Sequence, residues 1–112
     1  MKRIEKPWGS ELWFAHNELY AGKVIFIKRG TRSSLQYHRQ KHETILIQSG
    51  KAKATLEDEN GVLVERILGP GDIIENLPLR KHRLEALEDV TLIEVSTPQL
   101  DDVVRVEDDY QR

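Results

Sequence analysis

The feature that most constrains the fold of this chain is a succession of short strand-like runs, separated at close intervals by turn-forming residues. No stretch shows the 3.6-residue spacing of apolar side chains that is typical of an amphipathic helix. Many short β-rich runs bounded by Gly, Pro, Asn and Asp are typical of an all-β sandwich or barrel. We expect strands at residues 12–15, 23–28, 34–38, 44–48, 52–57, 63–67, 72–75, 82–86 and 91–95.

The residues between these runs suit tight antiparallel connections. Asn60-Gly61 in particular favours the positive φ angles of a short hairpin. The chain has no internal repeat and no low-complexity linker, so we expect one domain over residues 1–112, with a core at about 20–97. In the acidic flank at 100–112, valines alternate with charges, which predicts that this tail packs on the barrel.

Composition narrows the class of partner and the compartment. At 112 residues, with 38% hydrophobic and 32% charged residues, the chain can close one core. It has no cysteine, which excludes disulfides and thiolate metal sites and fits a cytoplasmic location. The apolar run at 24–27 is far shorter than the roughly 20 residues of a membrane span. Because the net charge is −2 and basic residues are scattered, we expect a small-molecule partner, with no nucleic acid and no membrane.

Four polar side chains are placed to converge inside such a barrel. Gln36 and His38 are two residues apart in one expected strand, so they point to the same face. Glu43 begins the next run, and His82 opens a later one. These residues offer an amide, two imidazoles and a carboxylate, which suits one divalent ion: zinc, or alternatively manganese, iron, cobalt or nickel. A hydrogen-bonded polar network without metal is the competing interpretation.

The spacing of these residues resembles the first motif of the cupin superfamily. Gly30 is followed by Gln36, His38, Glu43 and Gly50 at the intervals of that motif, with Gln36 where its first histidine usually stands. The resemblance implies an all-β, single-domain cupin, which is a double-stranded β-helix or jelly-roll barrel. Since small barrels leave exposed edges and cupins commonly pair, we also expect a homodimer.

A second cupin motif is present in altered form at residues 71–86. His82 stands at the expected place. Leu77 and Leu79 replace the usual proline and glycine, and Ala86 replaces the common asparagine. The motif therefore supports His82 as the last metal ligand.

Within the cupins, the chain resembles the mannose-6-phosphate isomerase group, including the isomerase domains attached to mannose-1-phosphate guanylyltransferases. Nearly the whole chain takes part, and the segments that support the resemblance are 6–10, 34–38, 81–85 and 102–110. In those isomerases a glutamine, two histidines and a glutamate hold the metal. The resemblance places this set on Gln36, His38, Glu43 and His82.

The resemblance implies a metal-dependent aldose–ketose isomerase for a sugar or sugar phosphate. Such an enzyme needs a base that moves a proton between neighbouring carbons. Tyr37, Lys81 and Glu85 are nearby in sequence, although strand parity puts Lys81 and Glu85 on the face opposite His82. The sequence therefore leaves the catalytic base open.

Substrate contacts are expected from Trp8, as a sugar platform, and from Arg32 and Arg80, as phosphate ligands. Basic residues in the turns at 39–41 and 80–81 predict a positive barrel mouth near the metal.

Three residues depart from the pattern of the guanylyltransferase-linked domains. Gln40 and Thr44 stand where those domains usually have histidines, and Lys41 stands where they usually have arginine. These changes leave two other functions open: a non-catalytic cupin that binds or senses a sugar or sugar nucleotide, and a metal-dependent oxygenase.

Overall fold

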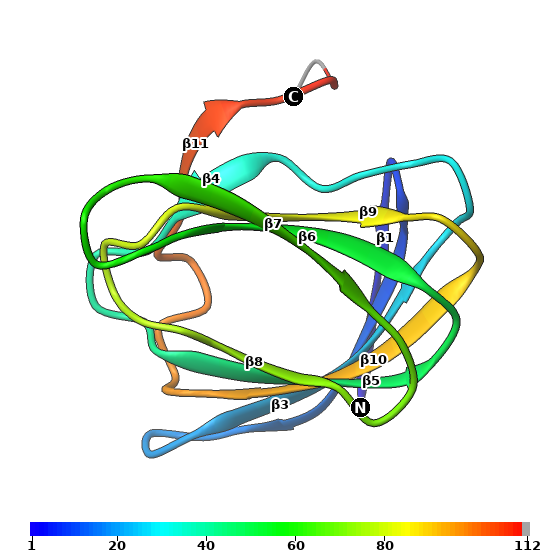
Figure 1. The fold of residues 1–112 in the computed structure, drawn as a ribbon. Helices are drawn as coiled ribbons and strands as arrows, with labels where there is room; N and C mark the ends of the chain where they lie inside the picture. Colours follow the sequence, from blue (N-terminus) through cyan, green and yellow to red (C-terminus); the bar gives the residue numbers. More distant parts are fainter. Residues whose placement is uncertain (111–112) are drawn as a thin grey trace.

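The computed structural model describes residues 1–110, which form eleven β-strands in two antiparallel sheets. The six-stranded sheet has the order β1-β2-β3-β10-β5-β8, and the five-stranded sheet has the order β11-β4-β9-β6-β7. The two sheets face one another across a shared interior (Figure 1), so the expected all-β fold is confirmed. The strands are β1 (Lys2–Lys6), β2 (Gly9–His16), β3 (Ala21–Ile27), β4 (Leu35–Tyr37), β5 (Glu43–Ser49), β6 (Ala52–Glu57), β7 (Leu63–Leu68), β8 (Ile73–Asn76), β9 (His82–Ala86), β10 (Val90–Ser96) and β11 (Val104–Glu107).

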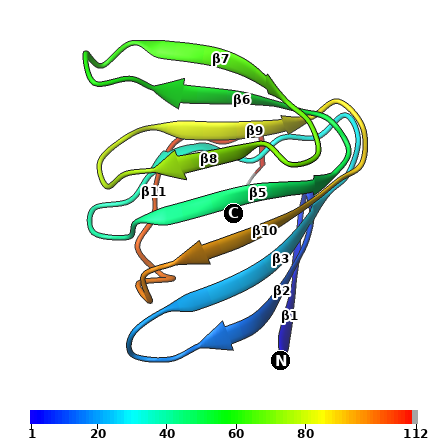
Figure 2. The ribbon, with the colours of Figure 1, turned by 60° about the horizontal axis from the view of Figure 1, so that its bottom comes forward.

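Two of these strands, β1 and β11, lie in the flanks and were not among the expected runs. β1 pairs with β2 along its whole length, and Figure 2 shows β1, β2, β3, β10 and β5 side by side in this order. β11 pairs with β4 at the edge of the other sheet. β1 contains one apolar residue, Ile4, and β11 has only four residues, so neither gives a run of apolar alternation long enough to be detected as a strand in the sequence. β1 forms a hairpin with the strand that follows it, whereas β11 depends on backbone pairing with β4, which is distant in the chain.

The core lies between the sheets. Branched side chains from β3, β5 and β10 fill it from one side, and small residues from β6 and β9 leave room for them on the other. The buried core residues are Trp8, Ile25, Ile27, Ile45, Ile47, Ala52, Ala54, Leu68, Ile74, Leu84, Ala86, Val90 and Leu92.

Within residues 1–110 the structure has no helix with the length and apolar character of a membrane span.

Two turn positions explain the motif spacing in physical terms. Gly50 has a φ of 87°, and a Cβ there would lie only 2.0 Å from the carbonyl oxygen of Asp89, so glycine is required. Leu79 has a φ of 68°, a left-handed conformation that glycine adopts without strain. The Leu79 N–H donates to the carbonyl oxygen of His38 at 2.6 Å. The turn that a glycine usually makes is therefore retained here by leucine, and it holds one metal-ligand candidate in place.

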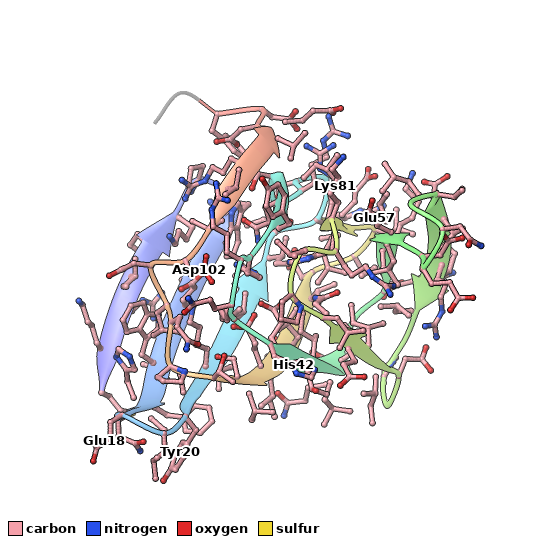
Figure 3. The ribbon with its side chains drawn as sticks, turned by 90° about the vertical axis from the view of Figure 1, so that its left-hand side faces the viewer. Glu18, Tyr20, His42, Glu57, Lys81 and Asp102 are labelled. Atoms are coloured by element: carbon pink, nitrogen blue, oxygen red, sulfur yellow. The ribbon has the colours of Figure 1, made fainter. Side chains whose placement is uncertain are left out.

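After β10 the chain crosses the open end of the barrel before it enters β11. Residues 97–103, which we call the strap, include Asp102, labelled in the view of this end in Figure 3. Three strap residues line the interior cavity described below: Leu100, Asp101 and Val103. The strap therefore forms part of the wall of the functional site.

Candidate metal centre

His38, Glu43 and His82 meet inside the barrel. Each offers one ligand atom, and these atoms all lie within 4.8 Å of one another. His38 Nε2 is 3.0 Å from Glu43 Oε1, and His82 Nε2 is 3.9 Å from Glu43 Oε2. The three residues are 3%, 3% and 6% exposed. The structure thus brings together three of the four residues that the sequence singled out, in a geometry that one small ion can bridge.

Both imidazoles direct the same nitrogen into the cluster. The Nδ1 atoms of His38 and His82 are hydrogen bonded to the carbonyl oxygens of Asp102 and Arg80, respectively. Because a carbonyl can only accept, each Nδ1 carries a proton, so each Nε2 presents a lone pair when its ring is neutral. Both Nε2 atoms are buried without a hydrogen-bond partner within residues 1–110. Two buried lone pairs beside a carboxylate fit a cation, so the residues present suit the implied metal.

The electrostatics of the cluster favour the metal-binding protonation states. Burial lowers the pKa of His82, which keeps its ring neutral at pH 7. Burial alone would raise the pKa of Glu43, but contact with His38 and the charge of Lys41 hold that pKa well below its usual value. The donor set at neutral pH contains a carboxylate and a neutral imidazole of His82, the forms in which these groups bind metals.

Gln36 lies beside this cluster. It is directly opposite His82 in the sheet register, and it lines the same cavity. Its Oε1 accepts a hydrogen bond from Ser34 Oγ at 3.0 Å. The amide oxygen is therefore engaged with Ser34, and the role of Gln36 as a fourth ligand stays a prediction.

Asp102 anchors the strap to the loop that carries His38. Its carboxylate accepts hydrogen bonds from the backbone N–H groups of Arg39, Gln40 and Lys41 at 3.0, 2.7 and 2.9 Å. Its own carbonyl orients the His38 ring. No sequence pattern indicates this role, because Asp102 is 64 residues from His38 along the chain.

A row of buried charges extends from the cluster across the six-stranded sheet. Lys41 Nζ lies 3.2 Å from Glu43 Oε1 and 3.1 Å from Glu94 Oε2. Lys23 Nζ lies 3.9 Å from the same Glu94 oxygen and 3.2 Å from Glu11 Oε1. We call Glu11, Lys23, Glu94 and Lys41 the interior charge row. Each lysine is held between two carboxylates, so their charges are largely neutralised inside the barrel.

The observed position of Lys41 differs from the one expected from the sequence. The sequence placed this residue in a basic turn at the mouth, but Lys41 is only 4% exposed and its side chain turns inward. Glu94 was missed altogether. A signal for it existed, since Glu94 is two residues from Leu92 in an expected strand and therefore shares the inward face.

Glu94 has the most strongly perturbed acid–base behaviour in the row. Burial, together with the negative charge of Glu43, raises the pKa of Glu94 to about 7. Lys41 and Lys23 offset this effect only in part. A carboxyl group with a pKa near neutrality can accept or donate a proton at physiological pH.

The cluster and the row line one cavity of about 410 Å³. Two aromatic side chains, Trp8 and Trp13, contribute to its wall, and Trp8 is also part of the buried core. The expected sugar platform is thus located at the cavity. Volumes of a few hundred Å³ are typical of small-molecule sites.

The two arginines expected to bind phosphate lie elsewhere. Arg32 Nε and Nη2 donate to the two carboxylate oxygens of Asp109 at 2.6 and 2.9 Å. Arg80 Nη1 points to the carbonyl oxygen of Glu57 at 3.5 Å. Neither arginine is among the described residues that line the cavity.

The candidate bases from the sequence are also outside the cavity lining formed by residues 1–110. The Lys81 N–H donates to Glu57 Oε1 at 2.8 Å, at the side of the opening seen in Figure 3. Glu85 faces Lys53 on the outer surface, with 3.5 Å between the charged atoms. Tyr37 is half-buried on β4. The structure does not bring these three side chains to the cluster.

The sequence matches the family model described as mannose-6-phosphate isomerase C-terminal over residues 1–108. It is 33% identical over 117 residues to the mannose-1-phosphate guanylyltransferase ManC of Salmonella typhimurium, covering 99% of this chain and 23% of that protein. It is 31% identical over 124 residues to the alginate biosynthesis protein AlgA of Pseudomonas aeruginosa, covering 97% and 23%. The chain thus spans less than a quarter of the length of these relatives.

Solved structures show the same architecture. KdgF from Halomonas sp. superimposes with a TM-score of 0.78 at 22% identity, over 90% of this chain and 91% of that one. The capsular polysaccharide assembling protein CapF of Staphylococcus aureus gives 0.81 at 19% identity, over 95% and 31%. These likenesses concern the fold. With the family match over nearly its whole length, the chain is an all-β cupin and belongs to the mannose-6-phosphate isomerase C-terminal family.

Proposed function

We propose that this domain is a metal-dependent aldose–ketose isomerase that acts on a sugar or sugar phosphate. One observation carries the proposal: a buried carboxyl group with a pKa near 7 shares a lysine with a candidate metal cluster inside a single cavity. The family, whose model is described as mannose-6-phosphate isomerase C-terminal, supports the same reaction class.

His38, Glu43 and His82 would hold the metal, with Gln36 as a fourth ligand. A bound divalent ion would polarise the carbonyl oxygen of the open-chain sugar and stabilise the negative charge that develops on it. The chain itself fixes the geometry, since backbone carbonyls at Asp102 and Arg80 orient the two rings. Trp8 and Trp13 give the cavity apolar walls that can pack against the sugar carbons.

Glu94 is the group that we assign to proton transfer. Its carboxylate takes the proton from the carbon next to the carbonyl, and the released electron pair forms the carbon–carbon double bond of an enediolate. The electron pair of the former carbonyl bond moves onto its oxygen. The Glu94 carboxyl group then returns the proton to the neighbouring carbon, while a proton passes between the two oxygens, so that the aldose becomes a ketose.

The position of Glu94 suits this role better than those of Tyr37, Lys81 and Glu85. Glu94 lines the cavity, and its Oε2 shares Lys41 Nζ with the Glu43 carboxylate. The carboxylates of Glu94 and Glu43 are therefore linked through a single ammonium group, that of Lys41. Lys41 and Lys23 hold Glu94 in place and stabilise its ionised form after it loses a proton.

The test combines metal analysis of the purified domain with assays of hexoses, pentoses and their phosphates. We expect one divalent ion per chain and isomerisation that a chelator abolishes. Replacing Glu94→Gln should lower turnover by about 100-fold or more while metal content is kept. Glu65→Gln, at an exposed ion pair with Lys53, is the matched control.

The alternatives make different predictions in the same assays. Saturable sugar binding without turnover in the parent would identify a non-catalytic sugar-binding cupin. Oxygen uptake would identify an oxygenase. Turnover that survives unchanged in Glu94→Gln would leave the isomerase in place but refute the assignment of Glu94.

We also propose that the domain forms a homodimer. β7 is an edge strand whose first five residues are exposed, and they include the apolar side chains of Leu63, Val64 and Ile67. Pairing with a second copy would cover such an edge. Light scattering at micromolar concentration tests this proposal, and a monomeric mass would refute it.

A further inference from the structure

We propose that Arg105 binds the anionic group of the ligand, a phosphate monoester, at the mouth of the cavity beside the metal site. This inference rests on the proposed function only for the sugar part of the ligand. It replaces Arg32 and Arg80, the residues expected from the sequence, with a residue from the C-terminal strand.

The register places Arg105 next to the metal site. Arg105 on β11 is directly opposite Gln36 on β4, and Gln36 is directly opposite His82 on β9. Residues that face each other across neighbouring strands project from the same side of a sheet. All three residues line the cavity. A guanidinium group therefore extends from the same face of the sheet as the candidate metal ligands, one strand beyond Gln36.

Arg105 differs from Lys23, Lys41 and Arg83 at the cavity in having no partner among residues 1–110. Lys23 and Lys41 are each held between two carboxylates. Arg83 Nε donates to the Ser33 carbonyl oxygen at 2.9 Å, and its Nη1 lies 3.5 Å from Glu107 Oε1. Within residues 1–110, no ion pair or side-chain hydrogen bond involves Arg105. Its five N–H donors remain available to a ligand.

Two lysines add positive charge to the same cavity. Lys2 and Lys6 of β1 line it, and neither forms an ion pair with a residue of the described chain. Lys2 Nζ lies 5.0 Å from the centre of the Trp13 ring. The strap contributes one exposed carboxylate to this wall, Asp101. The mouth of the cavity thus carries three cationic side chains, Arg105, Lys2 and Lys6, and one carboxylate, that of Asp101. This excess of positive charge suits the two negative charges of a phosphate monoester.

The interior of the cavity would not hold that group. The cations of the interior charge row are already neutralised by Glu11, Glu94 and Glu43, and further in the walls become apolar with Ile25, Ile27 and Leu92. The uncharged, reacting end of the ligand therefore points toward the cluster, and the phosphate stays at the mouth.

The experiment measures binding to the metal-loaded full chain by calorimetry with three probes: mannose 6-phosphate, mannose and inorganic phosphate. Arg105→Ala should weaken mannose 6-phosphate binding by about 10- to 100-fold, the usual scale for losing a charged hydrogen-bonding group. Mannose should change by less than about 3-fold, and metal content should be unchanged. Arg105→Lys should be intermediate, because an ammonium keeps the charge but loses the bidentate geometry.

Arg32→Ala is the matched control, since it removes an arginine that is bound to Asp109 and lies outside the cavity lining. It should affect all three probes by less than about 3-fold. The inference is overturned if Arg105→Ala and Arg105→Lys bind mannose 6-phosphate as tightly as the parent, or if mannose is weakened equally. It is also overturned if the parent itself prefers mannose to its phosphate. Selective loss in Arg105→Ala without turnover in the parent would support the inference and refute the isomerase.

Discussion

The two ends of the barrel interior have opposite chemistry, although the same strands build both. The inward residues of β3 run from Lys23 to Ile27, and those of β10 run from Glu94 to Val90. In the register, Lys23 lies opposite Glu94, whereas Ile27 lies opposite Val90. Antiparallel pairing thus gathers the polar residues at the open end and the apolar ones at the closed end. Each of these strands therefore contributes to stability at its apolar end and to the functional site at its polar end.

The largest expected effect concerns the open end. Replacing His82→Ala removes one of the clustered ligand candidates, so we expect metal affinity to fall by more than about 100-fold, since even outer-sphere changes cost 10- to 100-fold. Metal titration followed by elemental analysis measures this loss. The circular dichroism spectrum of the metal-free protein should match that of the parent. Unchanged metal content would show that His82 is not a ligand.

The matching change at the closed end is Leu92→Ala. Leu92 is 1% exposed and packs between β3 and β5, so we expect the free energy of unfolding to fall by about 2–5 kcal/mol. Metal stoichiometry should stay the same under conditions where the variant is folded. Denaturant unfolding of metal-free protein provides the measurement. A variant that lost metal without losing stability would contradict the division between the two ends.

The strap provides a weaker test of the open end. Asp102→Ala frees the backbone N–H groups of residues 39–41 and loosens the carbonyl that orients His38. We expect metal affinity to fall by about 10- to 100-fold with the fold retained. Asp101→Ala, the neighbouring exposed carboxylate, is the control and should keep the parent affinity. Equal affinities in both variants would show that the strap does not position the ligand.

A pH titration tests the buried charge at the open end. The pKa of Glu94 is raised to about 7 in the folded chain, against 4.5 for an ordinary glutamate. Between these values the native state holds a proton that the unfolded state lacks, so the stability that Glu94 contributes is lost as the pH rises.

Glu94→Gln lacks this titration. We therefore expect the metal-free variant to gain stability relative to the parent between pH 4.5 and 7, by at most about 1.4 kcal/mol per pH unit. Urea unfolding at several pH values measures the difference. The lowered pKa of His82 opposes the trend, but it is common to both proteins. A difference that does not change with pH would refute the raised pKa.

The smallest effect is expected at the altered second motif. Leu79→Gly relieves a left-handed backbone conformation at a side chain that is 62% exposed, so we expect stabilisation of about 0.5–1 kcal/mol. Leu77→Gly should instead destabilise, because Leu77 has no positive φ. Thermal unfolding of the two variants provides the comparison. If both changes destabilised the protein, strain at Leu79 would be ruled out.

Much of the fold was predictable because its signals are local. Short β-rich runs such as 44–48 and 91–95, with turn residues between them, indicated an all-β fold. The strands β1 and β11 escaped detection because residues 2–6 contain only one apolar side chain and residues 104–107 form a very short run, and pairing with β2 and β4 makes them strands. For β11 in particular, backbone hydrogen bonds to the distant strand β4 leave no trace in local composition.

Gln36, His38, Glu43 and His82 could be recognised as a group before the fold was known, because motif spacing and strand parity are properties of the amino-acid sequence. The charged side chains that surround this group could be identified only from the folded chain. It turned Lys41 inward onto Glu94, bound Arg32 to Asp109, and placed Arg105 opposite Gln36. These partners could not be predicted because the partner of a charged side chain depends on strand register and burial. Both are set by contacts between residues that are far apart in the chain.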